Sequence, residues 1–419
     1  MLLFGELKQN LIGAKVNKIF EPTNKDIIFN VYSNAKNYAI HFCLDSKNCR
    51  INLTTKDKAN PIVAPSFCML LRKYLTGAKL IEINTFNLER VCEFIFETKN
   101  ELQDISIKKV IVEIMGSHSN FILANENNGI IDSLKHVNSE EHEIMPARKY
   151  TLPINAKNNF LKLESFNEFM KELNYTSEIS IDKQISDNFV GISRSFINYI
   201  LSKLKIRSTN LSNNEIEQLY NYLKEITKNF NVLHLAQFEN DFFPEVDSIK
   251  TENLYNNFFL DDFYFNKETE EKFLQKRNNL LTYLSQALKK YTKRLENISK
   301  KLEECNNMEK YRIYGELVTA NLYRLKNENF EKITVQNYYD NNKDITIPLD
   351  KKYTISKNAS LFFKKYNKLK NTLNIVSKQK KETELELEYI ESILFSIDNS
   401  KNYEDLIEIE NEINESRFI

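Results

Sequence analysis

The chain has 419 residues, more than a single hydrophobic core usually serves, so we expect several domains. Its 58 basic residues equal its 58 acidic ones, and charged residues make up 28% of the sequence. This composition excludes a wholly disordered chain, and net charge alone gives no indication of a nucleic-acid partner.

The sequence contains no apolar run of the roughly 18 residues that a membrane-spanning helix needs, and its first residues do not resemble an export signal. We therefore expect a cytoplasmic protein without a membrane partner. An odd number of scattered cysteines, with no C-x-x-C pair, predicts reduced thiols and neither a disulfide framework nor a zinc site. These are Cys43, Cys49, Cys68, Cys92 and Cys305. We expect no metal and no cofactor.

Short β-branched and aromatic runs bounded by Asn, Asp, Gly or Pro follow one another over residues 14–150. This pattern is typical of an antiparallel sheet or sandwich. One helix, over residues 65–76, interrupts the strands and ends before Gly77, which suits a helix C-terminus. We predict a β-rich domain over residues 1–164.

Glu89 and Arg90 lie side by side in a predicted strand. Neighbouring strand residues point to opposite faces of a sheet, so at least one of them faces outward. An outward arginine could bind a phosphate, or it could simply decorate the surface.

The stretch EIMGSHSNFIL, residues 113–123, places polar residues between two apolar runs. It does not fit the G-x-S-x-G nucleophile elbow, because His118 and Asn120 occupy the Ser and second Gly positions. No carboxylate obviously orients His118 as a base, and no other histidine shares a metal-ligand spacing with it. The sequence leaves two possibilities: a turn at Gly116 that binds a polar partner, or one that only closes a hairpin.

Residues 165–230 have a helical pattern, and FVGISRSFINYIL places Gly191 just before a helix that starts near Ser193 and Arg194. Such a turn can present backbone N–H groups to a phosphate, but it could equally be a packing corner between helices. The acidic residues 231–267 are predicted to form a short-strand connector.

Leucine and other apolar residues then recur at alternating spacings of three and four, which is a heptad pattern. It covers residues 268–305 and returns over residues 361–419, on either side of a small insert at 306–360. Leu284 is a predicted seam residue of the first arm, and Ile390 is one of the second. Two arms of this kind fold back most economically as an antiparallel coiled-coil hairpin. A parallel dimer is the competing interpretation.

The two arms are unevenly charged. Residues 272–301 hold nine basic residues and one acid, and residues 351–381 hold ten lysines and no acid, whereas acids dominate after Glu382. The end of the hairpin near the insert is therefore predicted to be strongly positive and to contact phosphates. The lysines assigned to ribosomal RNA are Lys364, Lys365, Lys368 and Lys370.

Several stretches together resemble one family. EIMGSHSNFIL is similar to the E-L-M-G-x-H-S-N signature of the NFACT proteins, the group that includes bacterial RqcH and was formerly called fibronectin-binding protein A. PSFCMLLRKYLTGAKL, YRIYGELVTANLY and NASLFFKKYNKLK are similar to further family segments in the same order. The resemblance covers essentially the whole chain.

The resemblance implies an α+β multidomain fold. Its parts are a β-rich, glycosylase-like N-terminal domain, a helix-hairpin-helix domain, and a long antiparallel coiled-coil hairpin with a small middle insert. It also implies a ribosome quality-control factor that binds large ribosomal subunits carrying stalled peptidyl-tRNA and recruits tRNA, alanyl-tRNA in bacteria, for template-free tailing. The ribosome performs peptidyl transfer, so the chain is expected to be an RNA-binding factor rather than an enzyme, and a monomer on the ribosome.

The family's Asp-Arg pair for tRNA engagement falls on Glu89 and Arg90, with Glu in place of Asp. The tRNA-binding residues that the resemblance implies are Glu89, Arg90, Arg72, Lys73, Gly116, His118, Ser119 and Asn120. The residues of the helix-hairpin-helix motif are Gly191, Ser193 and Arg194. The family's opening Asp-Gly segment and its C-terminal RNA-binding domain have no counterpart here, so we expect a trimmed or shortened member with weakened ribosome binding.

Two other functions are open. A surface adhesin for fibronectin or fibrinogen is the runner-up, although neither a signal peptide nor an anchor motif supports it. A DNA-repair enzyme rests on the glycosylase-like fold alone, and residues 1–3 offer no nucleophile for it.

Overall fold

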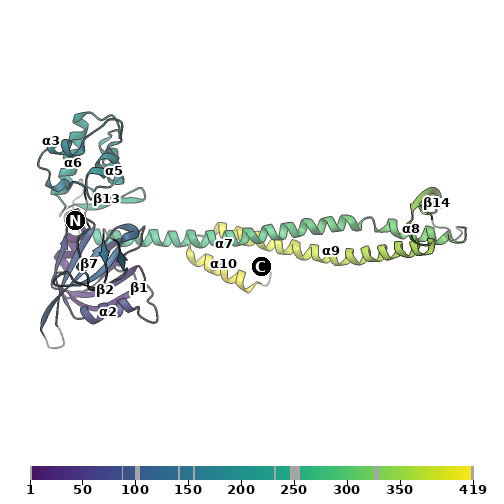
Figure 1. Ribbon diagram of the computed structural model, residues 1–419, viewed down its shortest axis with the longest axis horizontal. Coiled ribbons are helices and arrows are strands. Elements are labelled where there is room, and N and C mark those ends of the chain that lie inside the picture. The colour runs from purple at the N-terminus through teal and green to yellow at the C-terminus, as the bar shows by residue number, and fades with distance from the viewer. Residues whose placement is uncertain are drawn as a thin grey trace. The chain divides into compact units, whose positions relative to one another are not determined.

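The computed structural model describes residues 2–86, 88–99, 104–139, 142–153, 156–230, 233–245, 255–324 and 330–416. The chain divides into two compact units, Met1–Lys267 and Glu268–Ile419. Figure 1 shows a sheet with a group of short helices in the first unit and long helices in the second.

The first unit contains an antiparallel sheet of nine strands in the order β4-β3-β2-β1-β5-β6-β7-β8-β9, which confirms the predicted sheet. Most neighbours are consecutive hairpin partners, and the one exception is the pairing of β1 with β5, between which the chain makes β4 and a helix. The strands are β1 (Lys15–Thr23), β2 (Asp26–Ser33), β3 (Lys36–Cys43), β4 (Arg50–Thr54), β5 (Lys79–Thr85), β6 (Val91–Lys99), β7 (Ile105–Glu113), β8 (Asn120–Asn125) and β9 (Ile130–Ser133).

Helices α1 (Leu2–Leu11) and α2 (Ser66–Leu75) share one hydrophobic core with the sheet. Phenylalanines from four strands form its centre. The ring centroid of Phe42 lies 5.3 Å from that of Phe94 and 5.1 Å from that of Phe121, and both pairs meet edge to face. The predicted helix is present as α2, and Gly77 follows it with φ +81°, a backbone angle that favours glycine. After β9 in the chain, β10 (Val137–Asn138) and β11 (Glu143–Ile144) pair with each other in a separate two-stranded sheet.

Four helices follow in the same unit: α3 (Phe166–Leu173), α4 (Ile181–Asn188), α5 (Arg194–Leu204) and α6 (Asn213–Lys228). Their apolar faces meet the hairpin of β12 (His234–Phe238) and β13 (Asp241–Glu245) in a second hydrophobic core. Ser212 and Glu215 form a capping box that starts α6. Leu88, from the loop before β6, also packs against this core, so the loop touches the helices.

The long helix α7 (Tyr255–Cys305) begins earlier than the predicted 268, inside the stretch expected to be a strand connector. The reason lies in a distant residue. The buried Glu6 carboxylate accepts hydrogen bonds from the backbone N–H groups of Asn256 (3.1 Å) and Asn257 (3.1 Å), and from both side-chain amides. A carboxylate at this point satisfies N–H groups that the first turn of a helix leaves unpaired.

The second unit contains the rest of α7 and the helices and strands that follow it. These are α8 (Met308–Ala320), β14 (Lys332–Asn337), β15 (Lys343–Pro348), α9 (Ile355–Asn399) and α10 (Tyr403–Glu415). Helices α7 and α9 run antiparallel, because Arg277 pairs with Asp398 (2.8 Å) while Arg294, further along α7, pairs with the earlier Glu386 (3.4 Å). Predicted seam residues Leu284 and Ile390 are fully buried.

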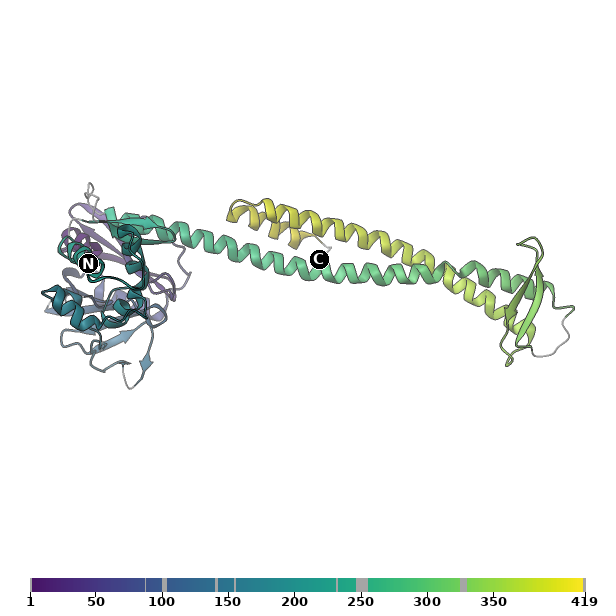
Figure 2. The same cartoon turned by 90° about the horizontal axis from the view of Figure 1, so that it is seen from above.

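The predicted second arm does not run straight on to residue 419. Helix α9 ends at Asn399, and Asn402 forms a capping box with Asp405 that starts α10 in a new direction. Leu406 and Ile409 of α10 pack into the core between α7 and α9, and Figures 1 and 2 both show α10 folded back beside these helices. Over the described part of the chain, no helix is both long enough and apolar enough to cross a membrane.

Candidate nucleic-acid interface

A pocket of about 510 Å³ lies in the first unit where the loop before β6 meets the turn between α4 and α5. The loop contributes Glu89 and Arg90, and the turn contributes Gly191 and Ser193. Met115, from the stretch EIMGSHSNFIL, also lines the pocket. The pocket therefore joins three regions that the sequence analysis selected separately.

Gly191 allows the two walls to approach each other. Its φ is +74°, and a Cβ added there would lie 2.5 Å from the carbonyl oxygen of Leu88 and 2.6 Å from the Leu88 Cβ. Both distances are shorter than any normal contact, and the first atom is backbone. The glycine is required for close packing at this corner as well as for its backbone angle.

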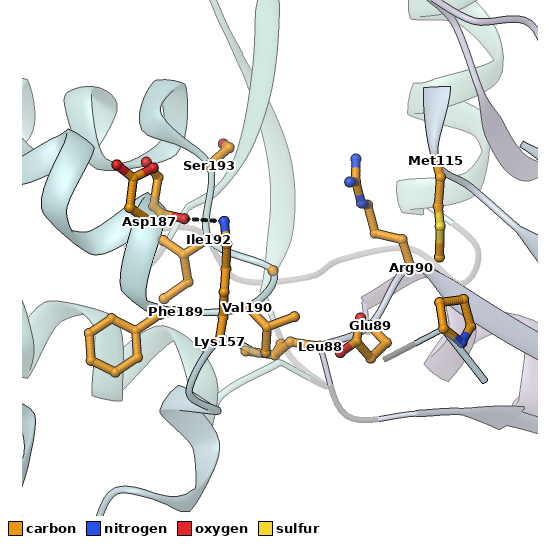
Figure 3. Close-up of a pocket in the computed structure, with 13 residues that line it drawn as sticks. Leu88, Glu89, Arg90, Met115, Lys157, Asp187, Phe189, Val190, Ile192 and Ser193 are labelled. Carbon is orange, nitrogen blue, oxygen red and sulfur yellow. Dashed lines mark hydrogen bonds between the residues drawn. The ribbon is translucent and has the colours of Figure 1, made fainter. Parts of the chain in front are cut away.

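Cationic groups reach the pocket from both sides. Figure 3 shows Arg90 and Lys157 on opposite walls, with Ser193 near the upper edge. The Lys157 Nζ donates a hydrogen bond to the Ser186 carbonyl oxygen (2.7 Å), which holds the lysine over the α4 side. Arg90 is exposed, and its guanidinium makes no hydrogen bond or ion pair with any residue in the described ranges.

The N-terminus of α5 lies at the edge of this pocket, since its N-cap residue Ser193 is part of the lining. Ser193 caps the helix, its hydroxyl oxygen accepting from the Phe196 N–H (3.2 Å). Arg194 lies just beyond, 3.8 Å from the Asp187 carboxylate, and donates from Nε to the Ser186 hydroxyl (3.3 Å). The pocket lining holds two carboxylates, those of Glu89 and Asp187, as well as two cations. The two cations beside a helix N-terminus are the groups that can bind a phosphate.

The prediction that Glu89 and Arg90 lie within a strand is wrong. They occupy a bend that ends at β6, whose first residue is Val91. Strand geometry therefore does not turn the two residues to opposite faces, and both line the same pocket. The Arg90 carbonyl still accepts from the Ile114 N–H (2.8 Å), which fixes the bend to the end of β7.

A second pocket, of about 440 Å³, lies next to the first and shares five residues with it: Leu88, Glu89, Arg90, Gly191 and Ser193. Its other walls are mainly aromatic. They include Phe4, Phe196, Phe230, Phe242 and Phe243. An arginine between a polar pocket and an aromatic one can hold a charged group on one side while flat apolar rings contact the other.

The turn at 116–120 divides into an outer and an inner part. Ser117 and His118 are exposed, whereas Ser119 and Asn120 are buried. The Ser119 hydroxyl accepts from the Met115 N–H (2.9 Å). The Asn120 amide donates to the Lys135 carbonyl (2.7 Å), and its oxygen accepts from the Lys135 N–H (3.0 Å). Ser119 and Asn120 thus stabilise the turn through hydrogen bonds within the chain, and the exposed His118 is accessible to a partner.

Glu113, just before this turn, is buried and has two partners. Its carboxylate accepts from the His142 Nε2 (2.7 Å) and from the Tyr150 hydroxyl (2.9 Å). Burial, followed by the Glu113 charge, raises the pKa of Tyr150. The network fastens the 142–150 segment to the end of β7, next to the pocket.

The other predicted residues of the N-terminal domain lie elsewhere. Arg72 and Lys73 are on α2, and neither lines the pockets described above. The Arg72 Nε donates to the Ile19 carbonyl oxygen of β1 (2.8 Å). Gly116 has φ +61°, and a Cβ there would lie 3.3 Å from the Ser46 carbonyl oxygen. Their tRNA-binding role stays a prediction.

The four lysines assigned to ribosomal RNA lie on the first half of α9 and are all exposed. Lys364, Lys365 and Lys368 share one side of the helix through spacings of three and four residues. The Lys365 Nζ lies 4.2 Å above the Tyr311 ring of α8. This side of α9 is positive and accessible in the second unit.

One group that could hold a metal ion was not found from the sequence. Asp26, His41 and Cys43 are buried, and their ligand atoms lie within 4.8 Å of one another. The Asp26 carboxylate is already bonded, accepting from the His41 Nε2 (2.7 Å) and the Lys58 Nζ (3.0 Å). Burial raises the pKa of the Cys43 thiol to about 11. A neutral thiol beside a lysine ammonium fits a hydrogen-bonded cluster better than a cation site.

Sequence reasoning missed Lys157 and the aromatic wall of the second pocket. Lys157 stands in a polar stretch without any motif, and it reaches the pocket only because the segment 156–159 runs beside α4. Phe242 and Phe243 belong to DFFPE, where two aromatic residues in a short acidic strand are the one available signal.

Comparisons with known proteins agree with this architecture. A family model for NFACT N-terminal and middle domains matches residues 2–419. The Rqc2 homolog RqcH of Bacillus subtilis (strain 168) is 31% identical over 423 residues, covering 99% of this chain and 74% of the relative. The archaeal Rqc2 homolog aRqcH of Methanocaldococcus jannaschii is 28% identical over 346 residues, covering 75% of this chain and 48% of the relative.

Among the solved structures that resemble this chain, two each match 63% of it. The N-terminal part of the fibronectin/fibrinogen-binding protein from Streptococcus suis is 28% identical, with a TM-score of 0.50, covering 63% of this chain and 96% of that one. The fibrinogen binding protein from Staphylococcus aureus is 26% identical, with a TM-score of 0.52, covering 63% and 99%. Because the family match extends over both units and includes every segment that builds the pocket, the chain belongs to the family of proteins with NFACT N-terminal and middle domains.

Proposed function

We propose that this chain is a cytoplasmic ribosome quality-control factor. It binds large ribosomal subunits that carry stalled peptidyl-tRNA and recruits tRNA, alanyl-tRNA in particular, so that the ribosome extends the stalled chain without a template. Membership of the NFACT family and similarity to proteins named as Rqc2 homologues support this role. In this proposal the chain binds and positions RNA, and the ribosome performs the peptidyl transfer.

The observation that carries the proposal is the pocket at Arg90. An exposed guanidinium, the Lys157 ammonium and the N-terminus of α5 converge there on a volume of about 510 Å³. Together they suit the phosphate backbone of an RNA, and the adjoining aromatic pocket suits the flat face of an unstacked base. We assign Glu89, Arg90 and His118 to tRNA contact, with Gly191 and Ser193 forming the helix-hairpin-helix turn against which the RNA backbone lies.

The paired helices of the second unit supply a separate RNA contact in this proposal. We interpret α7 and α9 as an antiparallel coiled-coil hairpin with α8, β14 and β15 as its insert. Ten lysines and no acid between residues 351 and 381 favour contact with ribosomal RNA. Lys364, Lys365, Lys368 and Lys370 are the residues assigned to it.

A titration with unmodified tRNA tests the pocket directly. Arg90→Ala removes the guanidinium, and Arg207→Ala is the matched control, because Arg207 is an exposed arginine of the same unit outside both pockets. One lost charge-assisted contact weakens binding by about 1.5–3 kcal/mol, roughly 10- to 150-fold. Equal affinities for the two variants would contradict the assignment of Arg90.

Binding to fibronectin or fibrinogen is the alternative, because two similar solved structures carry those names. It requires the protein to reach the cell surface. Labelling of intact cells with a membrane-impermeant reagent, followed by purification of the chain, separates the two functions. Labelling at the level of a known surface protein supports the adhesin, and labelling at the level of a cytoplasmic protein supports the ribosomal role.

A further inference from the structure

We propose that one side of α9 binds a basic protein segment that carries large apolar side chains. This surface consists of Leu385, Glu388, Ser392 and Phe395 and is called the 385–395 face. It lies in the second unit and differs from both RNA contacts assigned above. Exposed apolar groups and a reversal of charge along α9 mark it as a binding surface. Binding at this surface does not depend on RNA binding at Arg90.

The 385–395 face exposes two large apolar side chains. Leu385 is 61% exposed and Phe395 is 72% exposed. With Glu388 and Ser392 they follow spacings of three, four and three residues, so the four side chains form one continuous stripe on a helix. Single exposed hydrophobic residues are common, but these two lie about 15 Å apart on one stripe, a spacing that two apolar side chains of a single bound segment can match.

The partners of α9 within the chain use its other sides. Ile390, Ile393 and Ile397 are the buried residues that α9 contributes to the core with α7 and α10. The Tyr389 hydroxyl bonds to Glu412 of α10 (3.4 Å), which places α10 on a flank of the helix. The 385–395 face is left to solvent.

Charge identifies the chemistry of the occupant. Residues 382–415 hold twelve acidic residues and one basic residue, the reverse of the lysine-rich stretch before them. Five of these acids form ion pairs with lysines or arginines of α7 and α9, which leaves the others as the source of negative charge. Glu388 and Glu391 lie on or next to the stripe, are exposed, and make no ion pair or hydrogen bond within the described part of the chain. Such a field repels nucleic acid and attracts lysine- and arginine-rich segments.

Acidic neighbours alone would attract any cation weakly, and apolar groups alone would not select a partner. Their combination on one stripe fits a protein segment with Lys or Arg at the rim and Leu, Ile or Phe in contact with Leu385 and Phe395. An RNA lacks both features. A second copy of this chain could offer the lysine-rich half of its own α9, and the experiment distinguishes that case.

The test uses the whole chain and two synthetic probes: an amphipathic lysine–leucine helical peptide, and a shorter polylysine that contains the same number of lysines and therefore carries the same charge. Two variants alter the 385–395 face, Leu385→Ser with Phe395→Ser, and Glu388→Lys with Glu391→Lys. Two controls match them elsewhere. Ile375→Ser removes an apolar residue that is 59% exposed in the lysine-rich half of α9, and Glu304→Lys reverses an exposed acid of α7.

We expect the amphipathic peptide to bind the unaltered chain and both controls, and to bind each altered face at least about tenfold more weakly. Polylysine should bind more weakly than the amphipathic peptide and should be displaced by salt first. Arg90→Ala should bind the peptide normally, so failure of the tRNA assignment and failure of this inference give different results. Circular dichroism should show unchanged helix content, because all the altered side chains are exposed.

Equal binding of the peptide by the altered and control chains would overturn the inference. So would equal binding of polylysine and the amphipathic peptide, since apolar contact would then play no part. Sedimentation of the chain alone provides the last arm. A dimer that both altered faces dissociate would show that the occupant is a second copy rather than another protein.

Discussion

Replacing Gly191 by alanine tests how the pocket is built. The new Cβ would lie 2.5 Å from the Leu88 carbonyl oxygen, which belongs to the backbone and cannot rotate away. The residue would also keep φ near +74°, where a non-glycine residue costs about 1–2 kcal/mol. Overpacking adds about 1–3 kcal/mol, so the whole change should destabilise the first unit by about 2–5 kcal/mol.

Gly13→Ala separates the two contributions. Gly13 has φ +89°, but the nearest atom to an added Cβ is the Lys79 Cε at 3.9 Å, an ordinary contact. This variant therefore carries the backbone cost without the crowding, about 1–2 kcal/mol. The difference between the two variants measures how tightly the turn between α4 and α5 is pressed against the loop before β6.

Urea unfolding followed by circular dichroism gives the two free-energy changes, and hydrogen exchange localises them. In Gly191→Ala, exchange should increase at the amides of Leu88 and Ile192, on the two sides of the contact. Weaker tRNA binding should accompany it, because the pocket walls move apart. If both variants lose the same stability within about 0.5 kcal/mol, the close packing inferred at Gly191 is wrong.

Three further changes probe other parts of the molecule. Glu6→Ala leaves the first turn of α7 without its buried carboxylate and should cost about 3 kcal/mol in urea unfolding, whereas Glu82→Ala, an exposed acid of the same unit, should cost under about 0.5 kcal/mol. Burial lowers the pKa of His41 in the folded state. The hydrogen bond to Asp26 raises it, but by less. The neutral form of His41 is thus favoured by folding, so the unfolding free energy should fall as pH drops below about 6.5, and it should fall less steeply in His41→Asn. Replacing Lys364, Lys365, Lys368 and Lys370 by glutamine should lower the slope of log K against log salt for ribosomal RNA by about 3, and an unchanged slope would remove these lysines from the interface.

Local pattern was sufficient to predict the sheet and the long helices. Alternating apolar residues predict the strands because one face of each must be buried, and the heptad spacing predicts the side of α7 and α9 that is buried. Leu284 and Ile390 were selected on that ground, and both are fully buried. Gly77 and Gly191 were also found from sequence, since a glycine at the end or start of a helix has a local backbone cause.

The features that sequence reasoning missed depend on distant contacts. The early start of α7 depends on Glu6, about 250 residues before it in the chain, so no local signal could place it. The fold also decides which polar residues are accessible: Ser119 and Asn120 look like donors for a partner, but Met115 and Lys135 use them. Similarly, Glu89 and Arg90 line one pocket because they stand in a bend. The apolar residues around them have a strand-like pattern, so the sequence did not indicate a bend there.

Crosslinking in the native cells tests the central claim most directly. The chain, its Arg90→Ala variant and the Arg207→Ala control are crosslinked to RNA by ultraviolet light, and the RNA that co-purifies is sequenced. The proposed role predicts one enriched tRNA species together with ribosomal RNA from the large subunit, with the tRNA lost only in Arg90→Ala and the ribosomal RNA retained. Absence of tRNA enrichment from the unaltered chain, or equal enrichment in all three, would contradict it.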